Sequence, residues 1–141
     1  MNRVYWDTML FIYWLEAHPV HGPQVEQIYR RMTARGDQLH TSVLTIGEVL
    51  TGAYKAGRTN EARQLKEFFA SGEVKVLPFT AEAAERYALI RAQQKIAPAD
   101  AIHIATAAAA QMDVYVTNDI KLRKLVIDGI KFFSDLDGAI F

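Results

Sequence analysis

Short runs of β-branched and aromatic residues alternate along the chain with longer segments of helical spacing, and this alternation restricts the fold more than any other feature. The predicted strands cover residues 3–6 (RVYW), 38–43 (QLHTSV), 73–79 (EVKVLPF), 113–117 (DVYVT) and 130–134 (IKFFS). Strands that are joined through helices pair in parallel, because the chain must cross over the sheet between them. The sequence therefore predicts an α/β fold with a mostly parallel sheet.

The helices are predicted between these strands. They cover residues 8–17, 25–36, 45–57, 59–71, 80–94 and 96–111, with a short helix after a turn within 118–129. The segment 18–24 (HPVHGPQ) contains two prolines and a glycine and is predicted to be a break. Thr80 is expected to cap its helix, and Pro98 is expected in a first turn, where proline is tolerated.

Composition limits the functions that remain open. The 141 residues suffice for one compact domain, 1–141, and are too few for two ordinary ones. Lys plus Arg and Asp plus Glu balance at 16 each, so nucleic-acid binding would need a local basic rim. The absence of cysteine excludes disulfides, thiolate catalysis and cysteine zinc sites. No run reaches the roughly 18 apolar residues of a membrane span and nothing resembles a signal peptide, so a cytoplasmic protein is expected.

Four acidic residues stand at predicted strand-to-helix junctions or in first helical turns: Asp7, Glu48, Asp100 and Asp119. Each has an ordinary structural explanation. Asp7 and Asp119 could cap the helices that follow them, and Glu48 completes a T-x-x-E capping box with Thr45. Asp100 lies in a first turn, where a negative charge complements the helix dipole. Taken singly, each carboxylate is more simply a helix-end residue than a ligand.

Taken together, the four carboxylates indicate a metal site. Helices that follow strands of a parallel sheet begin at one edge, which is also where such sheets bind ligands. Carboxylates gathered there repel one another unless a cation neutralises them, and Mg²⁺ and Mn²⁺ prefer carboxylate oxygens and water. One or two such ions support phosphodiester hydrolysis, because they lower the pKa of water and stabilise the leaving oxygen.

These positions and their neighbours resemble the PIN-domain nucleases, in particular the VapC-type toxins of type II toxin–antitoxin pairs. VYWDT (4–8) is similar to the opening strand with its first metal-binding aspartate, and TSVLTIGEVLTGA (41–53) is similar to the second motif with its glutamate. ADAIHIATAAAAQMDVYVTND (99–119) is the most specific part and carries the other two acidic positions. The resemblance covers nearly the whole chain. Met9 departs from it, because many members carry a small polar residue there.

The resemblance implies a PIN-like three-layer sandwich, in which a five-stranded, mostly parallel sheet has helices on both faces. It implies a Mg²⁺- or Mn²⁺-dependent endoribonuclease whose catalytic metal ligands are Asp7, Glu48, Asp100 and Asp119, with Thr117 as an auxiliary ligand or hydrogen-bond donor. It also implies a cognate antitoxin, which in this family lies across a groove near the active site. No membrane partner is expected.

Several further residues have two interpretations each. Arg58, Lys121 and Arg123 could rim the metal site and bind RNA phosphates, or they could form solvated helix faces. His103, three residues after Asp100, could bind phosphate or relay a proton, but a histidine at a helix surface or core edge is the simpler interpretation. His18 and His21 (H-x-x-H) are interpreted as loop residues rather than as a zinc pair.

The apolar stretch 9–15 (MLFIYWL) cannot turn all of its side chains toward one core if it is helical. It either buries all but one or two of them or exposes a patch for antitoxin docking or self-association. A homodimer is the expected oligomer.

Three other functions fit some of the same residues. A PIN nuclease of RNA processing without an antitoxin would share all of them. A phosphatase with Asp7 as its nucleophile is disfavoured, because Met9 stands where its second aspartate belongs. A non-catalytic interaction module of the same fold is disfavoured by the intact acidic set.

Overall fold

The computed structural model describes residues 1–138 and 141 and places the five predicted strands in one sheet of order β3-β2-β1-β4-β5. The strands are β1 (Arg3–Trp6), β2 (Gln38–Ser42), β3 (Lys75–Leu77), β4 (Met112–Val116) and β5 (Ile130–Ser134). Each of the four strand pairings in this described part of the chain is parallel. The predicted sheet is therefore confirmed, and it is wholly rather than mostly parallel.

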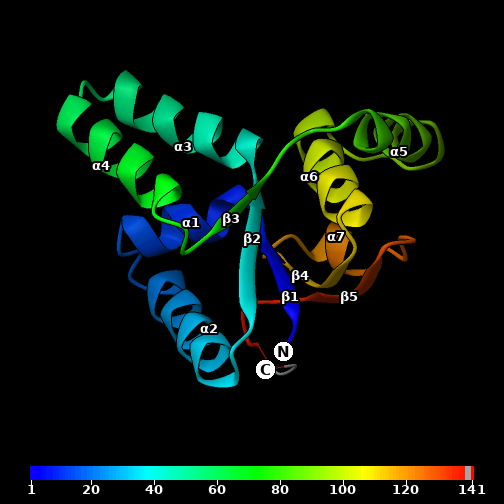
Figure 1. Cartoon of the computed structure of the whole chain (residues 1–141), viewed down its shortest axis with the longest axis horizontal. Coiled ribbons are helices and arrows are strands. Elements are labelled where there is room, and N and C mark those ends of the chain that lie inside the picture. Colours follow the sequence, from blue (N-terminus) through cyan, green and yellow to red (C-terminus); the bar gives the residue numbers. More distant parts are fainter. Residues whose placement is uncertain (139–140) are drawn as a thin grey trace.

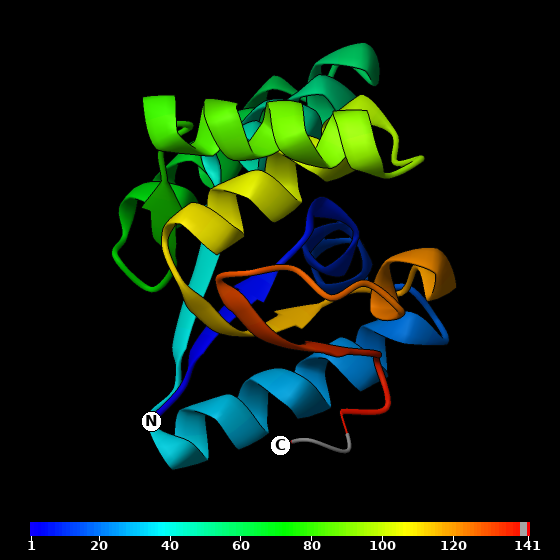
Figure 2. The ribbon, with the colours of Figure 1, turned by 90° about the vertical axis from the view of Figure 1, so that its right-hand side faces the viewer.

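Helices cover both faces of the sheet, as predicted for a three-layer sandwich. They are α1 (Thr8–Leu15), α2 (His21–Arg35), α3 (Val43–Lys55), α4 (Thr59–Ala70), α5 (Ala81–Gln93), α6 (Pro98–Ala109) and α7 (Ile120–Arg123). Helices α1 to α4 lie on one side of the strands and α5 and α6 on the other (Figure 1). Figure 2 shows α5 and α6 crossing the sheet on the side away from α2. None of the described helices is long and apolar enough to span a membrane.

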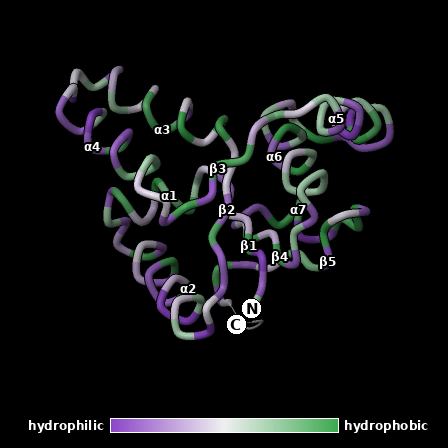
Figure 3. The backbone as a smooth tube through the Cα atoms, in the orientation of Figure 1, coloured by the Kyte–Doolittle hydropathy of each residue, from purple (hydrophilic) through white to green (hydrophobic). Residues whose placement is uncertain are grey.

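The alternation of side chains along the strands divides the core into two clusters. Val4 and Trp6 of β1 pack with α1 to α4, whereas Tyr5 between them packs on the other face with α6. This is the period of two that a strand imposes on its side chains. Along α2 and α4, hydrophilic and hydrophobic residues alternate around the coil, so each helix turns one face to the sheet and one to solvent (Figure 3).

Helix α6 packs closely because its side chains are small. Ala101, Ala105, Ala107 and Ala108 are fully buried. Gly129, just before β5, comes so near to α6 that an added Cβ would lie 2.3 Å from the carbonyl oxygen of Ala108. The close packing fixes α6, which carries Asp100 in its first turn, against the sheet.

Thr80 caps α5 as predicted, since its Oγ1 accepts a hydrogen bond from the amide of Ala83 at 3.1 Å. The predicted break at 18–24 is wrong in its second half, because α2 begins at His21. Pro23 lies in the first turn of α2, where a helix has no partner for the amide that proline lacks.

The predicted T-x-x-E capping box is also wrong. Helix α3 begins at Val43, and its N-cap is Ser42, whose Oγ accepts a hydrogen bond from the Leu44 amide at 3.0 Å. Thr45 therefore lies inside the helix, and its Oγ1 lies 2.7 Å from the Oγ1 of Thr41. Glu48 is thus not part of a helix cap.

The stretch 9–15 divides between core and surface. Leu10 and Phe11 are fully buried in the core, while Met9 is 44% exposed and Leu15 38% exposed. Ile12, Tyr13 and Trp14 are half-buried and pack against the same core, so the interpretation that all but one or two of these side chains turn to the core agrees with the structure.

We expect Gly129→Ala to lower the free energy of unfolding by about 1–3 kcal/mol more than Gly72→Ala, because overpacking costs about that much. Both glycines have positive φ, +98° and +91°, so the strain of placing alanine there is common to the two variants. Only Gly129 faces the Ala108 backbone, whereas an added Cβ at Gly72 meets nothing within 4 Å. Urea unfolding of both variants measures the difference, and equal losses would contradict the close contact.

Candidate active site

The four predicted carboxylates lie toward the carboxyl edge of the sheet. Asp7 follows β1 directly, Asp119 follows β4 at the N-cap of α7, Asp100 lies in the first turn of α6, and Glu48 lies on α3. Trp6 pairs with Val116 in the sheet, so Asp7 and Thr117 leave adjacent strands at the same level. The predicted convergence follows from the parallel pairing of β1 and β4.

Asp7 is the most deeply buried of the four. The residue is 8% exposed, and its Oδ1 has no hydrogen-bond partner within residues 1–138 and 141. The pKa of Asp7 is raised to about 6, mainly by burial and to a smaller extent by the Asp100 carboxylate, against the lowering effects of the Thr117 hydroxyl and of His103. The surroundings of Asp7 therefore destabilise the ionised form of its carboxyl group relative to the protonated form.

The other two aspartates lie nearer to the surface. Burial raises the pKa of Asp100, and the carboxylates of Asp119 and Glu48 raise it further. Asp119 caps α7 as predicted, since its Oδ1 accepts from the Lys121 amide at 2.9 Å. Thr117 is fully buried, and its Oγ1 accepts from the Asp119 amide at 3.1 Å. The Thr117 hydroxyl thus contacts the Asp7 carboxylate and the backbone of Asp119.

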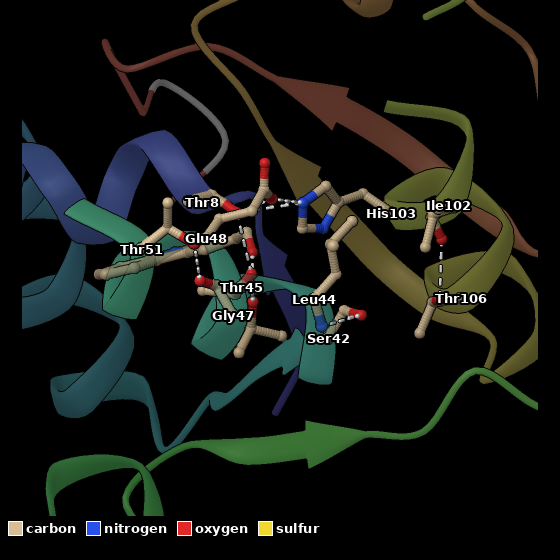
Figure 4. Close-up of polar contacts among 12 residues, drawn as sticks. Thr8, Ser42, Leu44, Thr45, Gly47, Glu48, Thr51, Ile102, His103 and Thr106 are labelled. Carbon is tan, nitrogen blue, oxygen red and sulfur yellow. Dashed lines mark hydrogen bonds and ion pairs between the residues drawn. The ribbon is translucent and has the colours of Figure 1, made fainter. Parts of the chain in front are cut away.

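Glu48 is held by two donors from other elements of the fold (Figure 4). Its Oε1 accepts from Thr8 Oγ1 at 2.6 Å and from His103 Nε2 at 2.9 Å. The His103 hydrogen bond is the largest cause of a lowered pKa of Glu48, and the Thr8 bond adds to it. His103 in turn lies 2.6 Å from the Tyr5 hydroxyl through Nδ1. Glu48 is therefore ionised and fixed in direction.

The sequence did not predict the contacts of Tyr5, Thr8 and His103. His103 is 3% exposed, which agrees with a core-edge histidine but not with one on the helix surface. The one signal in the sequence is its place three residues after Asp100, on the same helix face. The partners on β1 and α1 become visible only when the sheet and α6 are assembled.

The chemistry of the cluster fits a hard divalent cation. The four main predicted ligands are carboxylates, and Asp7 contributes a buried oxygen without a protein partner among the described residues. In the part of the chain that the structure describes, no three His, Asp or Glu side chains are arranged to hold an ion as they stand. The carboxylates therefore form an acidic cluster rather than a closed coordination shell.

The three predicted RNA-binding cations differ in their surroundings. Arg58 lines the same groove as Glu48 and lies 3.5 Å from the Glu61 carboxylate. Lys121 is exposed and follows Asp119 closely. Arg123 is paired with Asp135 at 2.8 Å, so its guanidinium already has an anionic partner.

The H-x-x-H motif lacks a free metal-binding nitrogen on its first histidine. His18 Nδ1 accepts from the amides of Val20, at 3.2 Å, and His21, at 3.0 Å, so its ring proton is on Nε2. This agrees with the interpretation of His18 as a loop residue. His21, which was expected in the same loop, instead begins α2 and stacks on the His18 ring with centroids 4.9 Å apart.

A wholly parallel five-stranded sheet with acidic residues at its carboxyl edge defines a class of α/β proteins. The family model described as the PIN domain matches residues 4–127, and the chain belongs to the PIN-domain family. The fold expected from the sequence motifs is thereby confirmed. No curated protein sequence matches the chain significantly.

Several solved structures share this fold. The DNA-bound VapBC of Salmonella typhimurium is 24% identical, with a TM-score of 0.75 over 96% of this chain and 99% of that chain. VapBC2 of Rickettsia felis, bound to a promoter DNA fragment, is 19% identical, with a TM-score of 0.74 over 94% and 98%. VapC20 of Mycobacterium tuberculosis, a toxin that cleaves the sarcin-ricin loop, is 17% identical, with a TM-score of 0.66 over 87% and 96%.

The burial of Asp7 predicts a pH-dependent stability. Its pKa is about 6 in the folded protein against the ordinary 3.8 of an aspartate in the unfolded chain, so between these values the folded state binds more protons than the unfolded state. Stability therefore falls as the pH rises through this range, by on the order of 3 kcal/mol at about 1.4 kcal/mol per pKa unit.

We expect Asp7→Asn to remove this decline. Denaturant unfolding between pH 4 and about 7, with EDTA present, measures the slope of stability against pH. Asp128→Asn changes an exposed carboxylate before β5, at the opposite edge of the sheet, and should keep the wild-type slope. An unchanged slope in Asp7→Asn would show that Asp7 does not carry the effect.

Proposed function

We propose that this PIN-domain protein is a metal-dependent endoribonuclease that acts as the toxin of a toxin–antitoxin pair. The observation that carries the proposal is an acidic cluster in which Asp100 interacts with the buried Asp7, whose Oδ1 is unpartnered among the described residues, and with the carboxylates of Asp119 and Glu48. The fold shared with VapBC complexes, and with a toxin that cleaves the sarcin-ricin loop, supports this choice of activity and partner.

Asp7, Glu48, Asp100 and Asp119 would hold one or two Mg²⁺ or Mn²⁺ ions. When bound, such ions activate water and stabilise the charge that develops on a phosphodiester during hydrolysis. Asp7 would provide the most deeply buried carboxylate of the cluster. Thr117 would orient this carboxylate and also hold the backbone of Asp119 through its hydroxyl. Thr8 and His103 orient Glu48. Without a cation the same cluster repels RNA phosphates, so ion binding is needed for substrate binding as well.

The RNA backbone would be held by cations beside the cluster. Arg58 and Lys121 suit this role, because one lines the Glu48 groove and the other is exposed next to Asp119. Arg123 would have to give up its ion pair with Asp135 to bind a phosphate, so it is the weakest of the three candidates.

A groove between α1, α3 and α4 suits an antitoxin segment. Its apolar lining includes Ile12, Leu15, Val49 and Leu65. Glu16, Glu48 and Glu61 outnumber Arg58 among its charged residues. An apolar segment with a basic side chain would complement this groove and place that side chain near the acidic cluster. A homodimer remains part of the proposal, with the exposed Met9 on α1 as a candidate contact, and light scattering tests it.

We expect Asp100→Asn to reduce the rate of RNA cleavage by more than about 100-fold. Loss of a residue that only hydrogen-bonds to a metal ligand typically costs up to about 100-fold. The larger loss is expected because Asp100 is itself a proposed ligand. A gel assay with a fluorescent RNA and Mn²⁺ measures the rate, and sequencing of the cut 5′ ends identifies the target. Asp128→Asn serves as the matched control and should cleave like the wild type. Full activity of Asp100→Asn would overturn the site and favour a non-catalytic module.

Expression of the wild type should arrest growth, and co-expression of a small neighbouring gene product should relieve the arrest. We expect Leu15→Glu to weaken this antitoxin complex at least about 10-fold, because it buries a charge against the apolar groove. Leu89→Glu is the control, since Leu89 is 53% exposed on α5, in the opposite helical layer. Pull-down titration measures both variants. An active nuclease without growth arrest or neighbour would instead be a PIN nuclease of RNA processing.

A further inference from the structure

One hydrogen-bonded chain crosses the sheet edge beside the acidic cluster. Glu48 is on α3, in the layer of α1 to α4, whereas His103 is on α6, in the opposite layer. The two side chains meet at 2.9 Å, and the Tyr5 hydroxyl on the central strand reaches the other side of the imidazole at 2.6 Å. Figure 4 shows the His103 ring directed at Glu48 and Thr8.

The chemistry of the partners assigns the direction of each bond. A carboxylate can only accept at neutral pH, so in the 2.9 Å contact with Glu48 His103 Nε2 must donate. Burial raises the pKa of Tyr5 well above its usual value, so the phenol keeps its proton and can donate to Nδ1 of a neutral imidazole. Thr8 donates to the same oxygen, Oε1, as His103 does. Because both of these bonds go to Oε1, neither occupies the second carboxylate oxygen, Oε2, which is available to another ligand.

We infer that His103 is a positioning residue, which turns the Oε2 of Glu48 toward the ion while Tyr5 holds the imidazole in place. The inference rests on the proposed function and adds a residue to it. His103 itself is 3% exposed and uses both ring nitrogens within the described chain, so it is not placed to contact RNA phosphate. A side chain that orients a ligating carboxylate contributes to metal affinity without touching the metal.

The test is the affinity for Mn²⁺, measured by calorimetry without RNA. We expect His103→Ala to weaken Mn²⁺ binding about 10- to 100-fold, and the Mn²⁺ concentration for half-maximal RNA cleavage to rise by the same factor. His103→Gln offers a side-chain amide donor in place of Nε2 and should recover part of the affinity. Tyr5→Phe keeps the ring that stacks on Tyr115 but removes the hydroxyl, and should weaken binding several-fold.

Thr106→Val is the matched control. Thr106 is a buried polar residue one turn further along α6, and its Oγ1 donates to the Ile102 carbonyl at 2.7 Å. Its loss should lower stability while leaving Mn²⁺ affinity unchanged. In a Glu48→Gln background, His103→Ala should have little further effect on Mn²⁺ binding, because both changes act through one carboxylate.

Wild-type Mn²⁺ affinity in His103→Ala, or an equal loss in Thr106→Val, would overturn the inference. If His103→Ala does not fold, the other two variants provide the test. Wild-type Mn²⁺ affinity in Tyr5→Phe would reject the inference. Equal Mn²⁺ affinities of His103→Gln and Thr106→Val would also reject it. Failure of the proposed function looks different, because the wild type itself would then neither bind Mn²⁺ nor cleave RNA, and the positioning role would fall with it.

Discussion

The parallel pairing of β1 with β2 on one side and with β4 on the other is the constraint on which the rest of the structure depends. Parallel neighbours require a crossover, so a helix must follow each strand and must begin at the same edge of the sheet. The residue after β1 is therefore enclosed by the ends of both neighbours, and this residue is Asp7. The burial of Asp7 is thus a result of topology, and the Asp100 carboxylate at the start of α6 interacts with it as well as with Glu48 of α3 and Asp119 before α7.

The acidic cluster costs folding free energy next to a fully buried part of the core. Beneath it, Tyr5 and Tyr115 stack at 5.0 Å between neighbouring strands, and the Tyr115 hydroxyl is buried with no hydrogen-bond partner among the described residues. Such local destabilisation persists only where the surrounding structure compensates for it, and it is typical of functional sites. The close packing of the α6 alanines, the Thr41–Thr45 hydroxyl pair and the two core clusters provide that compensation.

The sequence predicted the strands, most of the helices and the meeting of the four carboxylates, because these depend on local periodicity and on the rules of parallel sheets. It failed where tertiary partners compete with local motifs. Thr45 matches a capping box, but its hydroxyl contacts the hydroxyls of Thr41 and of Thr8 on α1, and Ser42 caps the helix instead. His103 has a readable spacing from Asp100, yet its partners come from β1, α1 and α3, whose side chains no local pattern brings together.

The separation of the core into two clusters has a consequence for how such a protein can diversify. The groove beside Glu48 is built on α1, α3 and α4, while Asp100 and His103 are carried by α6, and the sheet lies between the two layers. Substitutions that reshape the groove are absorbed within one cluster and leave the packing of α6 unchanged, because residues without shared contacts vary independently. The layer that carries the groove can therefore change in sequence while the residues of α6 stay the same. Glu48 is the exception, because it lines the groove and also bonds to His103 of the opposite layer.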